Sequence, residues 1–232
     1  MSTITAPTEL VEPRPIAVPR GRLGLLFAAL LVTSTSAFVL SVVSFAKPIG
    51  EGELPDYAAI AAHRSYVWTF FAAAGVQLVI GATAAALAAM LLAPNRWGTV
   101  GGSVVWIGAA LYGVGIGGWA SAYYFGSDPT LAPRSAAALI DRMNDDAAHL
   151  LAIPIGGAVL IALGTLMLAV ALWRARSVPR WVPIVGALTA VTAIIAAPDT
   201  VPGLLSEAAS SATTIAIGWY AWRRAAGPRY LH

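Results

Sequence analysis

The sequence predicts an all-α integral membrane protein, a polytopic bundle of six transmembrane helices with both termini in the cytoplasm. Composition, the lengths of the apolar runs and the distribution of arginine lead to this prediction. Of the 232 residues, 58% are hydrophobic and 11% are charged, whereas a soluble domain has about 25% charged residues. This composition excludes a soluble globule, a disordered chain and a nucleic-acid-binding domain. The chain has no cysteine, which also excludes disulfides and thiolate metal sites.

Six apolar runs account for most of the chain, and a membrane-spanning helix needs about 20 such residues. The predicted spans cover about 23–46, 65–93, 98–126, 148–173, 181–198 and 203–222. They form one transmembrane domain over residues 22–224, between a disordered tail at 1–21 and a short tail at 225–232. The stretches between the spans at 54–64 and 132–149 are expected to be helical extensions or interfacial helices.

The sixth span is the exceptional one. Its charge-free part, 208–222, covers only about 22 Å of a bilayer core that is about 30 Å thick. A helix that crosses the membrane has to begin near Pro202, which places Glu207 within or near the bilayer. A helix that begins at Ser206 instead leaves Glu207 in the first turn, at the level of the headgroups.

Arginine orients the bundle by the positive-inside rule. With both termini inside, the inner segments contain ten of the 14 Lys and Arg residues, and the outer segments contain nine of the 11 Asp and Glu residues. Rich in Ala, Val and Arg and poor in Lys, the sequence is typical of a high-GC bacterium, so we expect the plasma (cell) membrane and the lipid bilayer as a partner.

The first candidate site lies before the fourth span. Spacing of four residues places Asp141, Asp145 and His149 on one face of a helix, with Asp146 beside them. An Asp and a His one turn apart can bind a divalent metal or orient each other for proton transfer. The alternative is that these acids complement a helix dipole and His149 is an interfacial residue.

A second candidate lies at the outer end of the second span, where His63 precedes Arg64. His63 and His149 are the two histidines of the bundle, and both map to the outer side of the membrane. Together they could ligate one haem b or join acids around a metal ion. Taken alone, each would more often be an ordinary interfacial histidine, and it is their shared depth that favours a joint role.

The third candidate is Glu207, with Asp199 before it. A carboxylate at membrane depth is costly and therefore predicts a functional site. In the third span, Tyr112, Trp119 and Tyr123 form an aromatic stripe that either lines a cavity or packs against other helices. The string Gly113-x-Gly115-x-x-Gly118 lies in the same span and predicts close helix packing.

These residues lead to one functional hypothesis, an outward-facing pocket on the extracytoplasmic side. His63, Asp145, His149 and Glu207 are its expected catalytic residues, or its metal ligands if the chemistry depends on a metal. Its expected substrate-binding residues are Trp119, Tyr123, Tyr112, Arg64, Asp146 and Asp199. The predicted activity is acid–base chemistry of the lyase, cyclase or hydrolase type on a lipid-soluble, isoprenoid-like substrate. In size and composition the chain is similar to the integral-membrane terpene cyclases.

Other functions remain open on the sequence alone. The chain could be a redox subunit that binds haem b or a quinone, or a small-solute transporter. It could also be an assembly subunit without catalysis, packed against a membrane partner or a second copy of itself. A divalent metal, haem b and no cofactor are all compatible with these residues.

Overall fold

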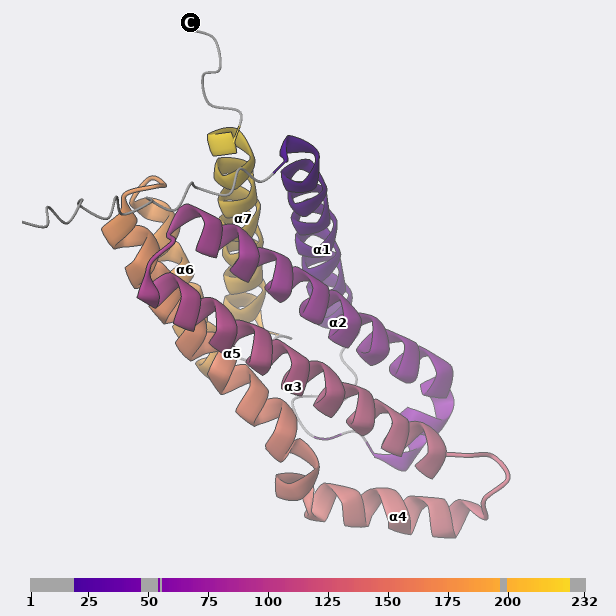
Figure 1. Cartoon of the computed structure of the whole chain (residues 1–232). Helices are drawn as coiled ribbons and strands as arrows, with labels where there is room; N and C mark the ends of the chain where they lie inside the picture. The colour runs from indigo at the N-terminus through magenta and orange to yellow at the C-terminus, as the bar shows by residue number, and fades with distance from the viewer. Residues whose placement is uncertain (1–18, 47–53, 55, 197–199, 226–232) are drawn as a thin grey trace, which may run out of the picture.

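The computed structural model describes residues 19–46, 54, 56–196 and 200–225, and these ranges are helical apart from short connections. The helices within them are α1 (Arg20–Ala46), α2 (Tyr57–Leu92), α3 (Arg96–Gly126), α4 (Pro133–Asp145), α5 (Ala147–Ala175), α6 (Trp181–Ile195) and α7 (Val201–Ala225). Figure 1 shows the long helices side by side, with α4 lying across one end of the bundle.

Four of these helices, α1, α2, α3 and α5, are long and apolar enough to cross a bilayer. Helix α6 is apolar but has 15 residues. Helix α7 has 25 residues and carries a polar run at 206–214. The fold is therefore an all-helical bundle of membrane type.

Contacts between helices show an antiparallel, up-and-down arrangement. A Cβ atom on Gly24 of α1 would lie 3.9 Å from the indole nitrogen of Trp222 near the end of α7. The guanidinium of Arg224 at the end of α7 donates a 3.0 Å hydrogen bond to the carbonyl of Leu92 at the end of α2. The beginning of α1 and the ends of α2 and α7 therefore meet at the same end of the bundle.

This shared end is strongly basic, and we call it the basic end. Its arginines are Arg20, Arg22, Arg96, Arg174, Arg176, Arg180, Arg223 and Arg224. The opposite end contains α4. The acids described there are Asp56, Asp128, Asp141, Asp145 and Asp146. The charge separation that the sequence predicts between inner and outer segments is thus a separation between the two ends of the folded bundle.

Glycines bring α3 and α5 into backbone contact. A Cβ atom on Gly108 would lie 2.8 Å from the carbonyl oxygen of Gly157, and one on Gly157 would lie 2.5 Å from the amide nitrogen of Tyr112. Two helical turns further along α5, a Cβ on Gly164 would lie 2.8 Å from the carbonyl oxygen of Gly101. Any larger side chain would push the two helices apart, since the atoms it would meet belong to the backbone.

The glycine string of α3 packs closely at two of its three positions. A Cβ on Gly115 would collide with Pro154 of α5, and one on Gly113 would meet Val79 of α2. At Gly118, in contrast, a Cβ would have nothing within 4 Å. The residues that hold α3 against α5 extend beyond this string, to Gly101 and Gly108.

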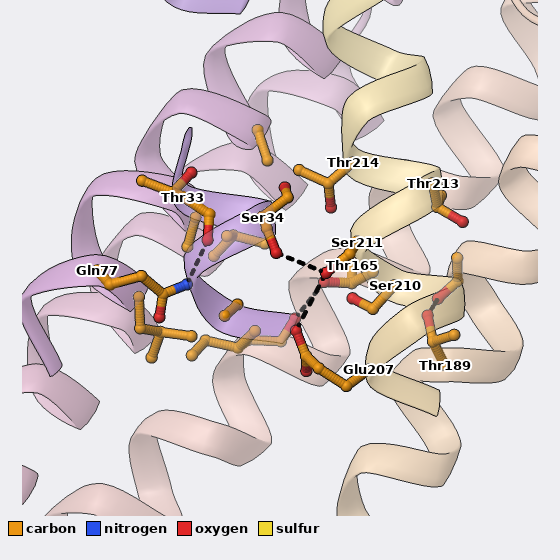
Figure 2. Close-up of a pocket in the computed structure, with 18 of the residues that line it drawn as sticks. Thr33, Ser34, Gln77, Thr165, Thr189, Glu207, Ser210, Ser211, Thr213 and Thr214 are labelled. Carbon is orange, nitrogen blue, oxygen red and sulfur yellow. Dashed lines mark hydrogen bonds between the residues drawn. The ribbon is translucent and has the colours of Figure 1, made fainter. Parts of the chain in front are cut away.

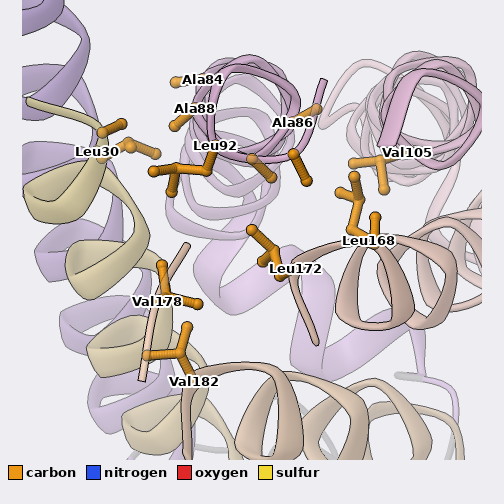
Figure 3. Packing of buried hydrophobic residues seen from close by; sticks show 14 residues of the cluster. Leu30, Ala84, Ala86, Ala88, Leu92, Val105, Leu168, Leu172, Val178 and Val182 are labelled. Atoms are coloured by element: carbon orange, nitrogen blue, oxygen red, sulfur yellow. The ribbon is translucent and has the colours of Figure 1, made fainter. Parts of the chain in front are cut away.

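Two clusters of buried side chains hold the bundle together. The larger one lies toward the basic end and includes Leu30, Leu92 and Val182, each exposed by 1% or less (Figure 3). The smaller one lies toward the opposite end. It joins Ile60, Trp119, Ala120, Tyr123 and Ile140, which come from α2, α3 and α4.

Two breaks interrupt the helices near the candidate residues. Asp146 has φ −106° and ψ 32°, so α4 ends at Asp145 and a new helix begins after it. The prediction that Asp141, Asp145 and His149 share one helical face is therefore wrong, because His149 belongs to a different helix. In α2, His63 has the non-helical angles φ −129° and ψ 25°.

Candidate functional site

A cavity of about 400 Å³, here called the central chamber, lies between α1, α2, α3, α5, α6 and α7. Polar side chains from the middle of several helices face it. They are Thr33, Ser34, Gln77, Thr165, Thr189, Ser210, Ser211, Thr213 and Thr214. The volume falls within the range of small-molecule binding sites.

Glu207 supplies the charge of the central chamber. Among the described residues that line it, Glu207 carries the only carboxylate, and none of them is Lys, Arg or His. Helix α7 begins at Val201, so Glu207 lies in the second helical turn and its side chain reaches the chamber. A carboxylate inside a helical bundle without a cationic partner is costly to keep unless it binds something.

Ser211 links Glu207 to the middle of α1, as Figure 2 shows. The hydroxyl oxygen of Ser211 lies 3.0 Å from the carbonyl oxygen of Ser34 and 3.4 Å from a carboxylate oxygen of Glu207. The neighbouring carbonyl, that of Thr33, accepts a 3.1 Å hydrogen bond from the Gln77 amide. Three helices therefore meet through polar contacts on one side of the chamber.

Four threonine hydroxyls of the chamber already donate their protons to the backbone. Thr33, Thr165, Thr189 and Thr213 each donate to a backbone carbonyl three or four residues earlier, at 2.8 to 3.1 Å. A hydroxyl that donates in this way keeps its lone pairs as acceptors. The walls therefore offer acceptor oxygens beside a carboxylate, which suits a cation or a ligand rich in hydrogen-bond donors.

Two hydroxyls near Glu207 make no hydrogen bond within the described chain. Ser210 and Thr214 follow Glu207 by three and seven residues, so they lie on the same face of α7. Both are available to a ligand that contacts Glu207.

Aromatic and apolar side chains line the rest of the central chamber. Phe70, Phe71 and Tyr112 face it, together with Leu40 and Ile116. Phe71 also contacts the smaller core cluster through an edge-on ring contact with Trp119, with ring centroids 4.4 Å apart. Aromatic rings that line the same cavity as a carboxylate can bind an organic cation through their faces.

The histidines and Asp145 do not join Glu207. His63, Asp145 and His149 are exposed, and none of them lines the central chamber. His149 instead contacts Asp146, also exposed, with 2.5 Å between Nδ1 and the carboxylate oxygen. Nowhere in the described ranges do three or more His, Asp or Glu side chains form a group that could hold a metal ion. The predicted single pocket of four residues is thus not assembled.

Arg64 has a structural position. Its guanidinium forms a 2.7 Å ion pair with Asp128, donates a 2.7 Å hydrogen bond to the carbonyl of Tyr124, and lies 3.8 Å from the centre of the Tyr124 ring. The pKa of Asp128 is lowered from its ordinary value, first by hydrogen bonds from Thr130 and then by the charge of Arg64. These contacts join the first half of α2 to the end of α3.

The predicted aromatic stripe divides between two places. Tyr112 lines the central chamber. Trp119 and Tyr123 are buried in the smaller core cluster, where the Tyr123 hydroxyl donates a hydrogen bond to Asn144. Asp199 lies outside the described residues.

Among the chamber residues that sequence reasoning missed are three polar ones, Gln77, Thr165 and Thr189. Each lies near the middle of a helix in an otherwise apolar stretch. That position was the available signal, since a polar side chain at mid-span has to find a partner or a cavity.

No family model, curated protein or solved structure matches this chain. The central chamber is therefore the basis for inferring its function.

Proposed function

We propose that this protein is a multi-pass membrane carrier that binds a small organic cation in the central chamber, with Glu207 as the counter-ion. The observation that carries the proposal is the pairing of one carboxylate with a chamber of about 400 Å³ lined by no basic side chain. A positive group on the ligand would supply the partner that Glu207 lacks among the described residues.

The chemistry of the walls favours an organic cation over a bare metal ion. Ca²⁺ and Mg²⁺ require six or more oxygen ligands close together, whereas this chamber has one carboxylate and three aromatic rings, from Phe70, Phe71 and Tyr112. Aromatic faces bind quaternary ammonium groups by cation–π attraction. The hydroxyls of Ser210 and Thr214 would then fix the orientation of polar groups on the ligand.

The membrane arrangement that fits this proposal has six spans and both termini in the cytoplasm. Helix α7, with 25 residues and about 37 Å at ~1.5 Å per residue, would be the sixth span. Helix α6, with 15 residues and about 22 Å, is shorter than the bilayer core and would be the fifth span in a membrane that thins around it. The basic end would face the cytoplasm of a bacterial cell by the positive-inside rule. The polar residues of the chamber would then lie near the middle of the bilayer, where carriers bind their substrates.

A second candidate keeps the acid–base chemistry that the sequence predicts. The chamber that contains Glu207 also has an apolar lining, which suits a lipid-soluble, isoprenoid-like substrate; this lining includes Leu40, Phe70, Phe71 and Ile116. In this version Glu207 alone would donate or accept the proton. The histidines, which are outside the chamber, would not take part.

Uptake of radiolabelled tetraethylammonium into proteoliposomes tests the carrier proposal. The wild-type protein should transport it, and Glu207→Gln should abolish uptake because the isosteric amide removes only the charge. Asp145→Asn is the matched control, since it removes an exposed carboxylate outside the chamber. Equal uptake by the wild type and Glu207→Gln would contradict the carrier proposal.

An uncharged probe separates the two candidates. Farnesol carries an isoprenoid chain and a hydroxyl but no charge. If farnesol raises the thermal stability of the purified protein and tetraethylammonium does not, the site accepts a lipid-soluble substrate and the second candidate is favoured. Stabilisation by tetraethylammonium alone favours the carrier.

A further inference from the structure

A second pocket, of about 390 Å³, lies at the basic end between the ends of α5 and α7. It is lined by Ala175, Arg176, Ser177, Tyr220, Arg223 and Arg224. We call it the arginine pocket. It is separate from the central chamber and shares no lining residue with it.

Three arginines line the arginine pocket, and none of them has an acidic partner among the described residues. Within the described ranges, the basic end contains no Asp or Glu. Arg224 is held in place by its 3.0 Å hydrogen bond to the carbonyl of Leu92. Arg176 and Arg223 form no hydrogen bond or ion pair with any described residue. All three arginines are exposed, so water screens part of their mutual repulsion, and an anion in the pocket would neutralise the rest.

The backbone at Arg176 supports a role for its side chain. Arg176 has φ 50° and ψ 30°, and it is the non-glycine residue with positive φ in the described chain. Glycine normally occupies this position after a helix because side chains are disfavoured there. An arginine in this unfavourable conformation suggests that its side chain has a function, such as binding a ligand.

Ser177 is also a lining residue of the arginine pocket. Its hydroxyl oxygen is buried and has no hydrogen-bond partner among the described residues. The next residue, Val178, is packed in the larger core cluster, which fixes this part of the chain. A buried hydroxyl without a partner indicates a missing ligand or water.

From this geometry we propose that the arginine pocket binds a phosphate group, held by Arg176, Arg223, Arg224 and the hydroxyl of Ser177. Guanidinium groups bind phosphate oxygens in bidentate fashion. The position favours the headgroup of an anionic phospholipid as the source, because basic pockets between membrane helices on the cytoplasmic side bind such headgroups. The exposed rings of Trp173, Trp181 and Trp219 at the same end are suited to the membrane interface.

The test measures binding of dioctanoyl-phosphatidylglycerol to the full-length protein in detergent, with dioctanoyl-phosphatidylcholine as the zwitterionic comparison. Arg223→Gln should weaken binding about tenfold, as expected for one charge-assisted contact. Ser177→Ala should also weaken binding, although it changes no charge. Arg22→Gln is the matched control, because it removes one charge from the same end but outside the pocket.

Retained binding in Arg22→Gln, with losses in Arg223→Gln and Ser177→Ala, supports the site. Competition with excess inorganic phosphate then identifies the source: displacement indicates that phosphate itself is sufficient, and no displacement indicates a lipid headgroup. Equal losses in Arg22→Gln and Arg223→Gln would overturn the proposal in favour of general charge attraction. So would equal binding of the two lipids, or wild-type binding by Ser177→Ala.

Discussion

The surroundings of Glu207 suit ligand binding more than they stabilise the folded protein. Within the described chain its hydrogen-bond partner is the Ser211 hydroxyl, at 3.4 Å, and no ion pair compensates its charge. Removing a carboxylate from water costs free energy unless charged or hydrogen-bonding partners replace the water. Residues of this kind are expected where a protein gives up some stability to bind a ligand.

Asp128 represents the opposite case, a carboxylate that contributes to stability. Its hydrogen bonds with Thr130 and its ion pair with Arg64 lower its pKa in the folded protein below the ordinary value of 3.8. A lowered folded-state pKa stabilises the protein above the unfolded pKa. That contribution is lost as pH falls through the folded-state pKa, where both states are protonated.

We therefore predict that Asp128→Asn lowers the melting temperature at neutral pH, and that its deficit relative to the wild type disappears under acidic conditions. Thermal denaturation in detergent measures this difference, from neutral pH to well below the ordinary value of 3.8 and past the lowered folded-state pKa. Asp141→Asn removes an exposed acid as a control. A deficit that stays constant down to the most acidic point would show that the charge of Asp128 is not what stabilises the fold.

At the level of the helices, glycine residues allow α3 and α5 to pack closely. Gly157 is the most informative position, because a Cβ there would lie 2.5 Å from the amide nitrogen of Tyr112 and 2.7 Å from the carbonyl oxygen of Gly108. Neither backbone atom can move without displacing a helix. Its neighbour Gly156 faces open space, where a Cβ would meet nothing within 4 Å.

Gly157→Ala should destabilise the protein by about 1–3 kcal/mol, the usual cost of overpacking. Gly156→Ala should be neutral or should stabilise the protein by about 0.5–1 kcal/mol, because alanine favours a helix over glycine. Thermal or denaturant unfolding of the two variants makes the comparison. Equal stability of the two variants would refute the close contact between α3 and α5.

Local rules located most elements, and they failed where a helix ends without a strong signal. Pro133 lies at the start of α4, as expected for a first-turn proline. The end of α4 carries no glycine or proline. It lies in the run 144–146, one Asn followed by two Asp, so the break at Asp146 could not be distinguished from a continuous helix. The grouping of Asp141 and Asp145 with His149 depended on that continuity.

For the molecule as a whole, the sequence predicted part of the candidate site but not which helices form it. Charge and hydropathy identified Glu207 as a costly residue near the membrane. They give the depth of a residue but do not specify which helices are neighbours. The pairing of α1 with α7, which brings Ser34 to Ser211, depends on interlocking side chains such as Leu30 against Gly218. His63 and His149 were predicted to lie at the same membrane depth as each other, but a shared depth does not imply contact with Glu207.

The absence of cysteine from the chain makes the proposed topology simple to test. Ala138→Cys places a thiol on the exposed surface of α4, and Ala175→Cys places one at the basic end. In intact cells, a membrane-impermeant maleimide should label Ala138→Cys. It should label Ala175→Cys only after permeabilisation. The reverse pattern would invert the proposed orientation.

The most direct test of the central claim is the dissociation constant of tetraethylammonium, measured by equilibrium dialysis for the purified wild type, Glu207→Gln and Asp145→Asn. We predict at least about tenfold weaker binding for Glu207→Gln, since it removes the charge that pairs with the ligand. We predict wild-type binding for Asp145→Asn, and no loss of melting temperature for Glu207→Gln. Wild-type affinity in Glu207→Gln, or equal weakening in both variants, would contradict the assignment of the central chamber as a cation site.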